Sequence, residues 1–236
     1  MVADASHELR TPLAVMRSEL DVTLRAGTLP DPAQEVLVSV REEVDRITRT
    51  VDNLLTMAQA DEGRLELLTG PVDIGKLVEE VVDRLQPVAV ASGVSLAVRG
   101  DPWQADADGP RLSIALTNLV ENAITFAAEG GTVVVALWRR APEAGVTVSD
   151  DGPGIPVADQ ARVFDRFYRA DGPGTRHRRG SGLGLAICRD IAVAHGGRVW
   201  VESQPGRGSS FSLALPDWRI SVDGRPAADT PGGRRP

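Results

Sequence analysis

Lysine, cysteine and long apolar runs are scarce in this chain of 236 residues. Lys76 is its only lysine, and the residues around it lack the upstream glycine and the hydroxyl of a P-loop. The single cysteine, Cys188, excludes an intramolecular disulfide and a cysteine zinc site, and it suits a reduced, cytosolic setting. A net charge of −7 argues against a nucleic-acid partner.

No apolar run approaches the roughly 20 residues that a membrane-spanning helix needs, and no signal peptide opens the chain. We therefore expect no membrane contact by this fragment: either the protein is soluble or a membrane portion has been cut away. Because lysine is nearly absent, a phosphate-binding site here would depend on Mg²⁺, arginines, backbone amides and helix dipoles.

The first quarter of the chain has the pattern of a helical hairpin. Apolar residues spaced three or four apart predict a helix over 2–26, and Asp31 with Pro32 starts a second helix after a Gly-Pro break. Apolar residues of the second helix form a heptad seam: Leu37, Val40, Val44, Ile47, Val51, Leu54 and Ala58. We expect residues 1–62 to dimerise as a four-helix bundle; the alternative is a hairpin packed on its own C-terminal domain.

A mixed domain follows a linker over residues 63–71. Residues 72–218 carry helical patterns over 74–90, 110–127, 157–168 and 183–195, and strand-like runs over 95–98, 132–137, 146–148, 198–201 and 210–215. A helix–sheet sandwich follows, so the fold class of the whole chain is α+β. The tail 219–236 is rich in Gly, Pro and Arg and is predicted to be disordered.

The first helix carries His7 on its polar side. Helical geometry places His7 roughly 160° from the apolar positions and Thr11 within about 40° of His7. Pro12 costs a helix about 3 kcal/mol, which favours a deliberate bend next to His7 and Glu8. A lone exposed histidine is more commonly just a solvated side chain, so the meaning of this motif depends on the rest of the chain.

Asn118 and Asn122 lie one turn apart on the helix predicted over 110–127. Asparagine is a mediocre helix former, and two amides beside an apolar stripe make a polar ridge at the rim of the core. Their oxygens can complete the shell of a Mg²⁺ ion whose other ligands are phosphates and water. A pair of ordinary surface amides is the alternative.

Three glycine-rich loops and a basic segment complete the set of motifs. DDGPGIP (residues 150–156) follows a strand, and a carboxylate there could accept a hydrogen bond from the exocyclic amine of adenine. GSGLGL (180–185) opens a helix, where amides and the dipole favour phosphate. GRG (206–208) is typical of a hairpin turn. Between the first two loops, FDRFYR (164–169) and the basic stretch to residue 179 suit a lid over a nucleotide, or a plain surface loop.

In this order and spacing, the segments resemble the sensor histidine kinases of two-component systems. The resemblance covers residues 2–216: SHELRTP (6–12) resembles the H-box, Asn118–Asn122 the N-box, and Asp150–Gly154 the G1 box. Phe164–Arg169 resembles the F-box, Gly180–Leu185 the G2 box, and Gly206–Phe211 the final glycine box. It implies a dimerisation and histidine phosphotransfer hairpin followed by an ATP-binding catalytic domain of the histidine kinase/gyrase type.

The resemblance also implies a role for each matching residue. His7 would be the nucleophile that takes the γ-phosphoryl of ATP, Glu8 its base, and Thr11 the residue that positions water to dephosphorylate a response regulator. Asn122 would hold Mg²⁺ with support from Asn118, and Asp150 would bind the adenine amine. The other implied nucleotide-site residues are Phe126, Gly152, Gly154, Tyr168, Arg169, Gly182, Leu183 and Gly184. A response regulator would be the partner, and a membrane sensor segment is expected upstream of this cytoplasmic portion.

Two departures from the family pattern leave alternatives open. Thr125 stands where the family often has a basic residue, and Arg176, Arg178 or Arg179 could replace that lost phosphate contact. Only six residues precede His7, so we interpret the chain as a kinase fragment. A non-catalytic nucleotide-sensing scaffold is supported only by Thr125, and the phosphoacceptor hairpin argues against an ATP-driven machine of the gyrase superfamily.

Overall fold

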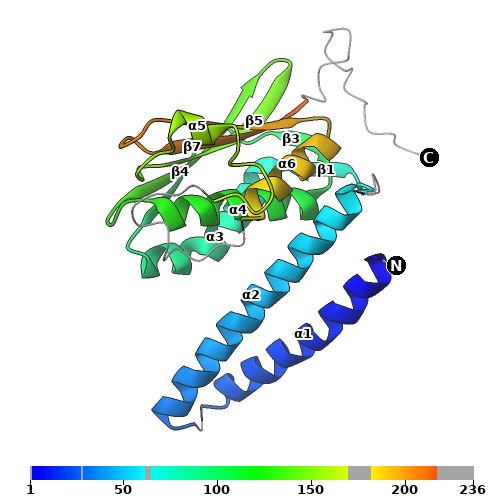
Figure 1. Cartoon of the computed structure of the whole chain (residues 1–236), viewed down its shortest axis with the longest axis vertical. Helices are drawn as coiled ribbons and strands as arrows, with labels where there is room; N and C mark the ends of the chain where they lie inside the picture. Colours follow the sequence, from blue (N-terminus) through cyan, green and yellow to red (C-terminus); the bar gives the residue numbers. More distant parts are fainter. Residues whose placement is uncertain (1, 28, 62–64, 170–181, 217–236) are drawn as a thin grey trace, which may run out of the picture. The chain divides into compact units, whose positions relative to one another are not determined.

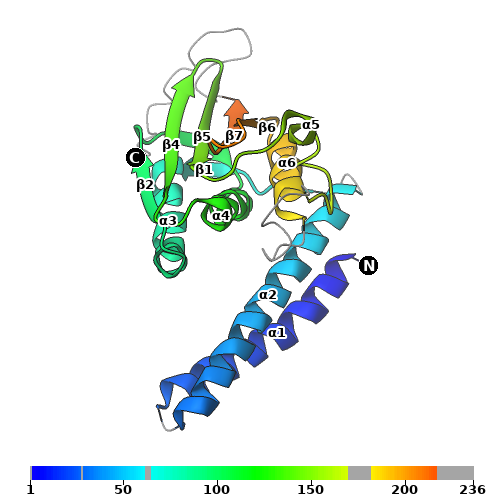
Figure 2. The same cartoon turned by 60° about the vertical axis from the view of Figure 1, so that its left-hand side comes forward.

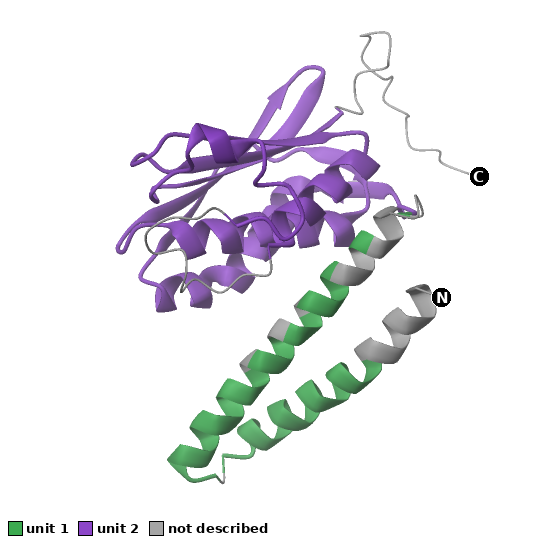
Figure 3. Cartoon of the chain, viewed as in Figure 1, with its two compact units in different colours: residues 1–65 green, residues 66–236 purple. Residues whose placement is uncertain are grey.

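The chain consists of two compact units, residues 1–65 and 66–236 (Figures 1 and 3). The computed structural model describes residues 2–27, 29–61, 65–169 and 182–216. For residues 2–10 and for positions 42, 46, 49, 54–56 and 58–61 it describes the backbone alone.

The first unit is the expected helical hairpin. Helices α1 (Val2–Arg25) and α2 (Asp31–Asp61) are joined by a short turn in which Gly27 has a φ of 63°. Pro12 lies inside α1, which continues past it to Arg25. The two helices bury Leu13, Val44 and Met57.

Several large apolar side chains are exposed on the described part of the hairpin. Val44 is only 6% exposed, whereas Val40 and Ile47 on either side of it are 43% and 41% exposed. The other exposed large apolar residues of α1 and α2 are Val15, Met16, Val22 and Val36. One edge of the heptad seam therefore packs within the hairpin, and the other edge faces outward.

The second unit is the expected helix–sheet sandwich. Five strands form a mixed sheet in the order β2-β4-β5-β7-β6, with β2 and β4 parallel and the other pairs antiparallel. Their bounds are β2 (Ser95–Arg99), β4 (Thr132–Arg140), β5 (Glu143–Asp150), β6 (Arg198–Ser203) and β7 (Ser209–Pro216). Helices α3 (Ile74–Ala91), α4 (Gly109–Phe126) and α6 (Gly184–Ala194) lie together on one face of this sheet (Figures 1 and 2).

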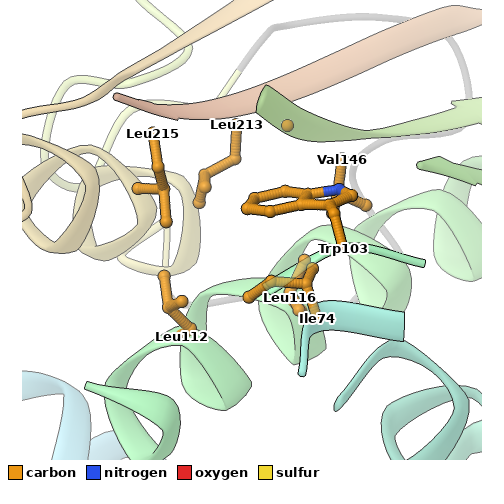
Figure 4. A pocket seen from close by; sticks show the side chains of 8 residues that line it. Ile74, Trp103, Leu112, Leu116, Val146, Leu213 and Leu215 are labelled. Carbon is orange, nitrogen blue, oxygen red and sulfur yellow. The ribbon is translucent and has the colours of Figure 1, made fainter. Parts of the chain in front are cut away.

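The core lies between these helices and the sheet. Leu119 of α4, Ile187 of α6 and Phe211 of β7 are each at most 1% exposed. A small cavity of about 10 Å³ remains there (Figure 4), which is about the space of one water molecule. Its lining residues are Ile74, Trp103, Leu112, Leu116, Gly145, Val146, Leu213 and Leu215. This cavity is apolar and far too small for a nucleotide.

Three elements differ from the sequence-based expectation. A two-stranded antiparallel sheet, β1 (Gly70–Asp73) with β3 (Gln104–Ala107), occupies part of the predicted linker and an unassigned stretch. The helix predicted over 157–168 is only the single turn α5 (Val157–Gln160). Successive turns follow α5, and they still bury Val163 and Phe164, so the apolar spacing is satisfied without a helix.

Candidate active site

Asp150 ends β5, the third strand of the sheet order, and is 7% exposed. Its Oδ1 accepts a hydrogen bond from the backbone amide of Gly152 at 2.9 Å. Its Oδ2 is buried and has no hydrogen-bond partner within the described part of the chain. Burial raises the pKa of this carboxyl, against the lowering effect of the Gly152 and Ser209 amides. A buried acceptor without a donor costs free energy, so Oδ2 is suited to a ligand that supplies a donor.

The loop after Asp150 is held by close backbone contacts that only glycine permits. A Cβ on Gly152 would overlap the carbonyl oxygen of Phe126, at the end of α4. Gly154 has a φ of 72°, and a Cβ there would overlap the carbonyl of Gln204. The amide of Gly206 donates to the carbonyl of Pro153 at 2.7 Å. The G1-like loop, the end of α4 and the β6–β7 turn are therefore packed together.

Asp151 fixes the turn that leads from α4 to β4. Its two carboxylate oxygens accept hydrogen bonds from the amides of Ala128 at 3.1 Å and Thr132 at 2.9 Å. Gly131 makes room for this carboxylate, because a Cβ at that position would overlap it. The sequence predicts this carboxylate at a strand end but indicates no role for it. Nothing in the sequence alone shows which amides it meets.

The predicted N-box and G2 box residues meet where α4 and α6 touch. A Cβ on Gly184, the first residue of α6, would lie 3.0 Å from the Oδ1 of Asn118. Asn122 follows one turn later on α4 and is half-buried. Thr125 is exposed, and its hydroxyl donates to the carbonyl of Glu121 at 2.7 Å. The amide side chains, the start of α6 and the loop after Asp150 thus lie around the C-terminal half of α4.

The F-box-like segment meets Gly182 through its backbone. Phe167 has a φ of 60°, and its amide donates to the carbonyl of Gly182 at 2.9 Å. The hydroxyl of Tyr168 donates to Asp159 at 2.7 Å, and the guanidinium of Arg162 lies 4.4 Å from the centre of the Tyr168 ring. The Tyr168 side chain is therefore engaged with α5 and the turn after it. Arg169 is exposed, and Leu183 is buried.

Some of the predicted site residues lie wholly or partly outside the described residues. His7 and Glu8 belong to α1, but their side chains lie outside the described residues, and Thr11 is exposed on the same helix. Arg176, Arg178 and Arg179, along with Gly180 and Ser181, fall within the stretch 170–181, also outside the described residues.

A protein-only metal centre is not present among the described residues: no group of three or more His, Cys, Asp or Glu side chains there could hold an ion. Asn118 and Asn122 fit a different arrangement, in which amide oxygens assist a Mg²⁺ ion that phosphates and water mainly hold. Across the same described residues, no helix has the length and apolarity to cross a bilayer.

Two family models match the chain. The His Kinase A (phospho-acceptor) domain matches residues 1–63, and the histidine kinase-, DNA gyrase B-, and HSP90-like ATPase matches residues 107–219. The probable sensor histidine kinase TcrY of Mycobacterium tuberculosis is 39% identical over 91% of this chain and 45% of its own length. The chain thus spans about half the length of such curated relatives.

Solved structures agree with both models. Full-length ShkA in complex with AMPPNP superposes with a TM-score of 0.72 at 30% identity, over 91% of this chain and 45% of that one. The mycobacterial sensor histidine kinase MprB superposes with a TM-score of 0.56 at 32% identity, over 68% of this chain and all (100%) of that one. On this evidence the chain belongs to the sensor histidine kinases, with their phosphoacceptor hairpin followed by their ATPase domain.

Proposed function

We propose that this chain transfers the γ-phosphoryl group of ATP to His7 and then to an aspartate of a response regulator. The main observation in favour of ATP as the nucleotide is the buried Oδ2 of Asp150, which has no hydrogen-bond partner among the described residues. The exocyclic amine of adenine is a donor and would satisfy this acceptor, whereas guanine has a carbonyl at the corresponding position. Membership of the histidine kinase family supports the same choice of nucleotide.

The phosphates would lie toward the start of α6. Gly182, Leu183 and Gly184 would present backbone amides to them, and the positive end of the helix dipole would favour their charge. Gly152 and Gly154 would keep the adenine side of the pocket open. Phe126 and Tyr168 would line the pocket, and Arg169 would supply positive charge for the phosphates. Because Tyr168 is hydrogen-bonded to Asp159, its part would be to hold the segment that carries Arg169.

Asn122, with Asn118 beside Gly184, would hold Mg²⁺ through an amide oxygen. When bound, the ion neutralises phosphate charge, which a site nearly without lysine otherwise does poorly. The chain's own contribution is to fix the amide oxygens on α4 and to position the terminal phosphate for attack.

The chemical step uses the H-box residues. A ring nitrogen of neutral His7 attacks the γ-phosphorus, a P–N bond forms, and the P–O bond to ADP breaks. Glu8 accepts the proton from the other ring nitrogen, so no positive charge is left on the phosphorylated ring. The phosphoryl group then moves from nitrogen to a carboxylate oxygen of the regulator's aspartate. Thr11 would position water for the opposing phosphatase reaction, in which the regulator's phospho-aspartate is hydrolysed.

The hairpin would pair with a second copy as a four-helix bundle, because its outward-facing apolar edge needs a partner. The relatives named as sensor kinases support a response-regulator receiver domain as the phosphoryl acceptor. They also support a membrane sensor segment upstream, with this portion in the cytoplasm.

One incubation separates the competing functions. The protein is mixed with γ-labelled ATP and Mg²⁺, and protein-bound label is followed before and after acid treatment. Acid-labile label on the protein supports the histidine kinase. Released phosphate without label on the protein would instead indicate an ATPase of the gyrase type, and neither product would indicate a nucleotide-sensing scaffold.

A further inference from the structure

Helices α4 and α6 run antiparallel and touch at three levels. Near the proposed nucleotide site, Gly184 packs against Asn118. In the middle, the thiol of Cys188 donates to the carbonyl of Ala115 at 3.3 Å. At the far end, the backbone amide of Asp108 donates to the imidazole Nε2 of His195 at 3.0 Å. The last contact joins the residue before α4 to the residue after α6.

Asp108 gathers three segments at this far end. It is 5% exposed and caps α4, with its Oδ1 accepting from the amide of Arg111 at 3.0 Å. Its Oδ2 accepts from the amide of Leu68 at 3.0 Å. Leu68 belongs to the segment that leads into β1 (Gly70–Asp73). Through one residue, this entry segment, the start of α4 and the end of α6 are all hydrogen-bonded.

The bonding of His195 fixes its tautomer. The Asp108 amide can only donate, so Nε2 must be the acceptor. Nδ1 lies 2.8 Å from the carbonyl of Ile191, which can only accept, so Nδ1 carries the proton. Both ring nitrogens are therefore used, one within α6 and one across to Asp108. An apolar side chain at this position would leave the Asp108 amide without its acceptor.

We propose that His195 and Asp108 are positioning residues that set the register of α4 against α6 for nucleotide binding. This inference rests on the proposed function, because it assumes that the nucleotide lies between Asn118 and Asn122 on α4 and Gly182 to Gly184 at α6. Asn118 is ten residues along α4 from Asp108, or about 15 Å at the helical rise. The hydrogen bond between Cys188 and Ala115 lies between this link and the Gly184–Asn118 contact at the site. Loss of the link lets α6 shift along α4 and separates the amides from the asparagines.

The test compares three variants of the whole chain. His195→Phe keeps a planar ring but removes the acceptor, His195→Gln offers an oxygen that can accept from the Asp108 amide, and Val193→Ala changes an exposed residue of the same helix end. ADP affinity is measured by calorimetry in Mg²⁺, thermal unfolding gives a stability readout, and amide hydrogen exchange is followed at Asp108 and Gly184.

We expect His195→Phe to weaken ADP binding about three- to tenfold, the size of one hydrogen bond, and to speed exchange at both amides. His195→Gln should restore affinity to within about twofold of the parent under the same relation, and Val193→Ala should match the parent. Unchanged affinity in His195→Phe, no rescue by Gln, or an equal loss in Val193→Ala would each overturn the proposal. A parent protein that does not bind ADP would instead count against the proposed function, and the exchange data would still report on the link.

Discussion

Asp150 has two properties that each cost free energy in the unliganded protein. Burial raises the pKa of its carboxyl, so the charged form is held at a cost, while one of its oxygens has no partner among the described residues. An asparagine side chain at this position would avoid the cost of the charge, but its NH2 group, a donor, would replace one of the two acceptor oxygens. The same residue therefore lowers the stability of the free domain and favours a ligand with an amine.

Asp150→Asn should weaken ATP or ADP binding more than tenfold. A hydrogen bond to a charged acceptor contributes about 1.5–3 kcal/mol, and the amide can present a donor to the adenine amine. Calorimetry on the purified protein measures this directly. Affinity equal to the parent's would remove Asp150 from the adenine site.

The stability of the free protein should change in the opposite direction. The folded-state pKa of Asp150 is raised, so its neutral form favours folding and its charged form disfavours it. Parent and Asp150→Asn should thus be equally stable below the ordinary aspartate pKa of about 3.9. The variant should become the more stable of the two as pH rises through the raised value. Urea unfolding at acidic and neutral pH checks the sign, and a less stable variant at neutral pH would contradict it.

At the residue scale, the sequence predicted the residues that belong to a motif, but not those whose partners lie far away in the chain. The glycines at 152, 154 and 184 lie where the loops crowd other backbone or Asn118. The tasks of Asp151 and His195 were missed, because each depends on amides from a distant segment: Thr132 for Asp151, and Asp108 for His195. Such pairings depend on how segments meet in space, which residue spacing does not encode.

Among the elements, long helices with a regular apolar repeat were predictable from the sequence, and the shortest strands were not. The expected helices over 2–26, 74–90 and 110–127 match α1, α3 and α4 to within one residue at each end. The strands β1 and β3 have four residues each and were missed, since β3 is Gln-Ala-Asp-Ala and carries little strand propensity. After Gln160 the chain forms turns instead of a helix, and the end of this segment is fixed by the hydrogen bond from the amide of Phe167, which has a positive φ, to the carbonyl of Gly182.

The geometry of α1 gives a prediction about two activities in one site. His7 and Thr11 are one turn apart on the same helix, so a regulator that receives phosphate from His7 also brings its phospho-aspartate near Thr11. Thr11→Ala should leave autophosphorylation within a few-fold and reduce dephosphorylation of the cognate regulator by about 10²-fold or more. Time courses of both reactions measure the split. Equal losses would indicate that Thr11 acts through the helix around Pro12 instead.

At the scale of the whole molecule, the hairpin is incomplete by itself. It buries Val44 but leaves Val40 and Ile47 exposed, so only part of the heptad seam can be a surface for a second copy. A substitution at Val44 would therefore disturb the hairpin, and the exposed pair is the sharper probe of dimerisation.

Val40→Glu combined with Ile47→Glu should convert the dimer to a monomer while the hairpin stays helical. Two unpaired charges would otherwise be buried in the bundle, which is costly. Light scattering gives the mass and circular dichroism the helix content. Val157→Glu, at a residue 80% exposed in the other unit, is the matched control and should stay dimeric. A parent that is monomeric at every concentration would contradict the dimer.

The central claim is that His7 is the phosphoacceptor, and one comparison tests it most directly. Parent protein and His7→Gln are incubated with γ-labelled ATP and Mg²⁺, and nucleotide binding by each is measured alongside. We predict acid-labile label on the parent, no label on His7→Gln, and near-equal nucleotide affinity, because His7 and the pocket belong to different units. Acid-labile label that persists on His7→Gln would contradict the account.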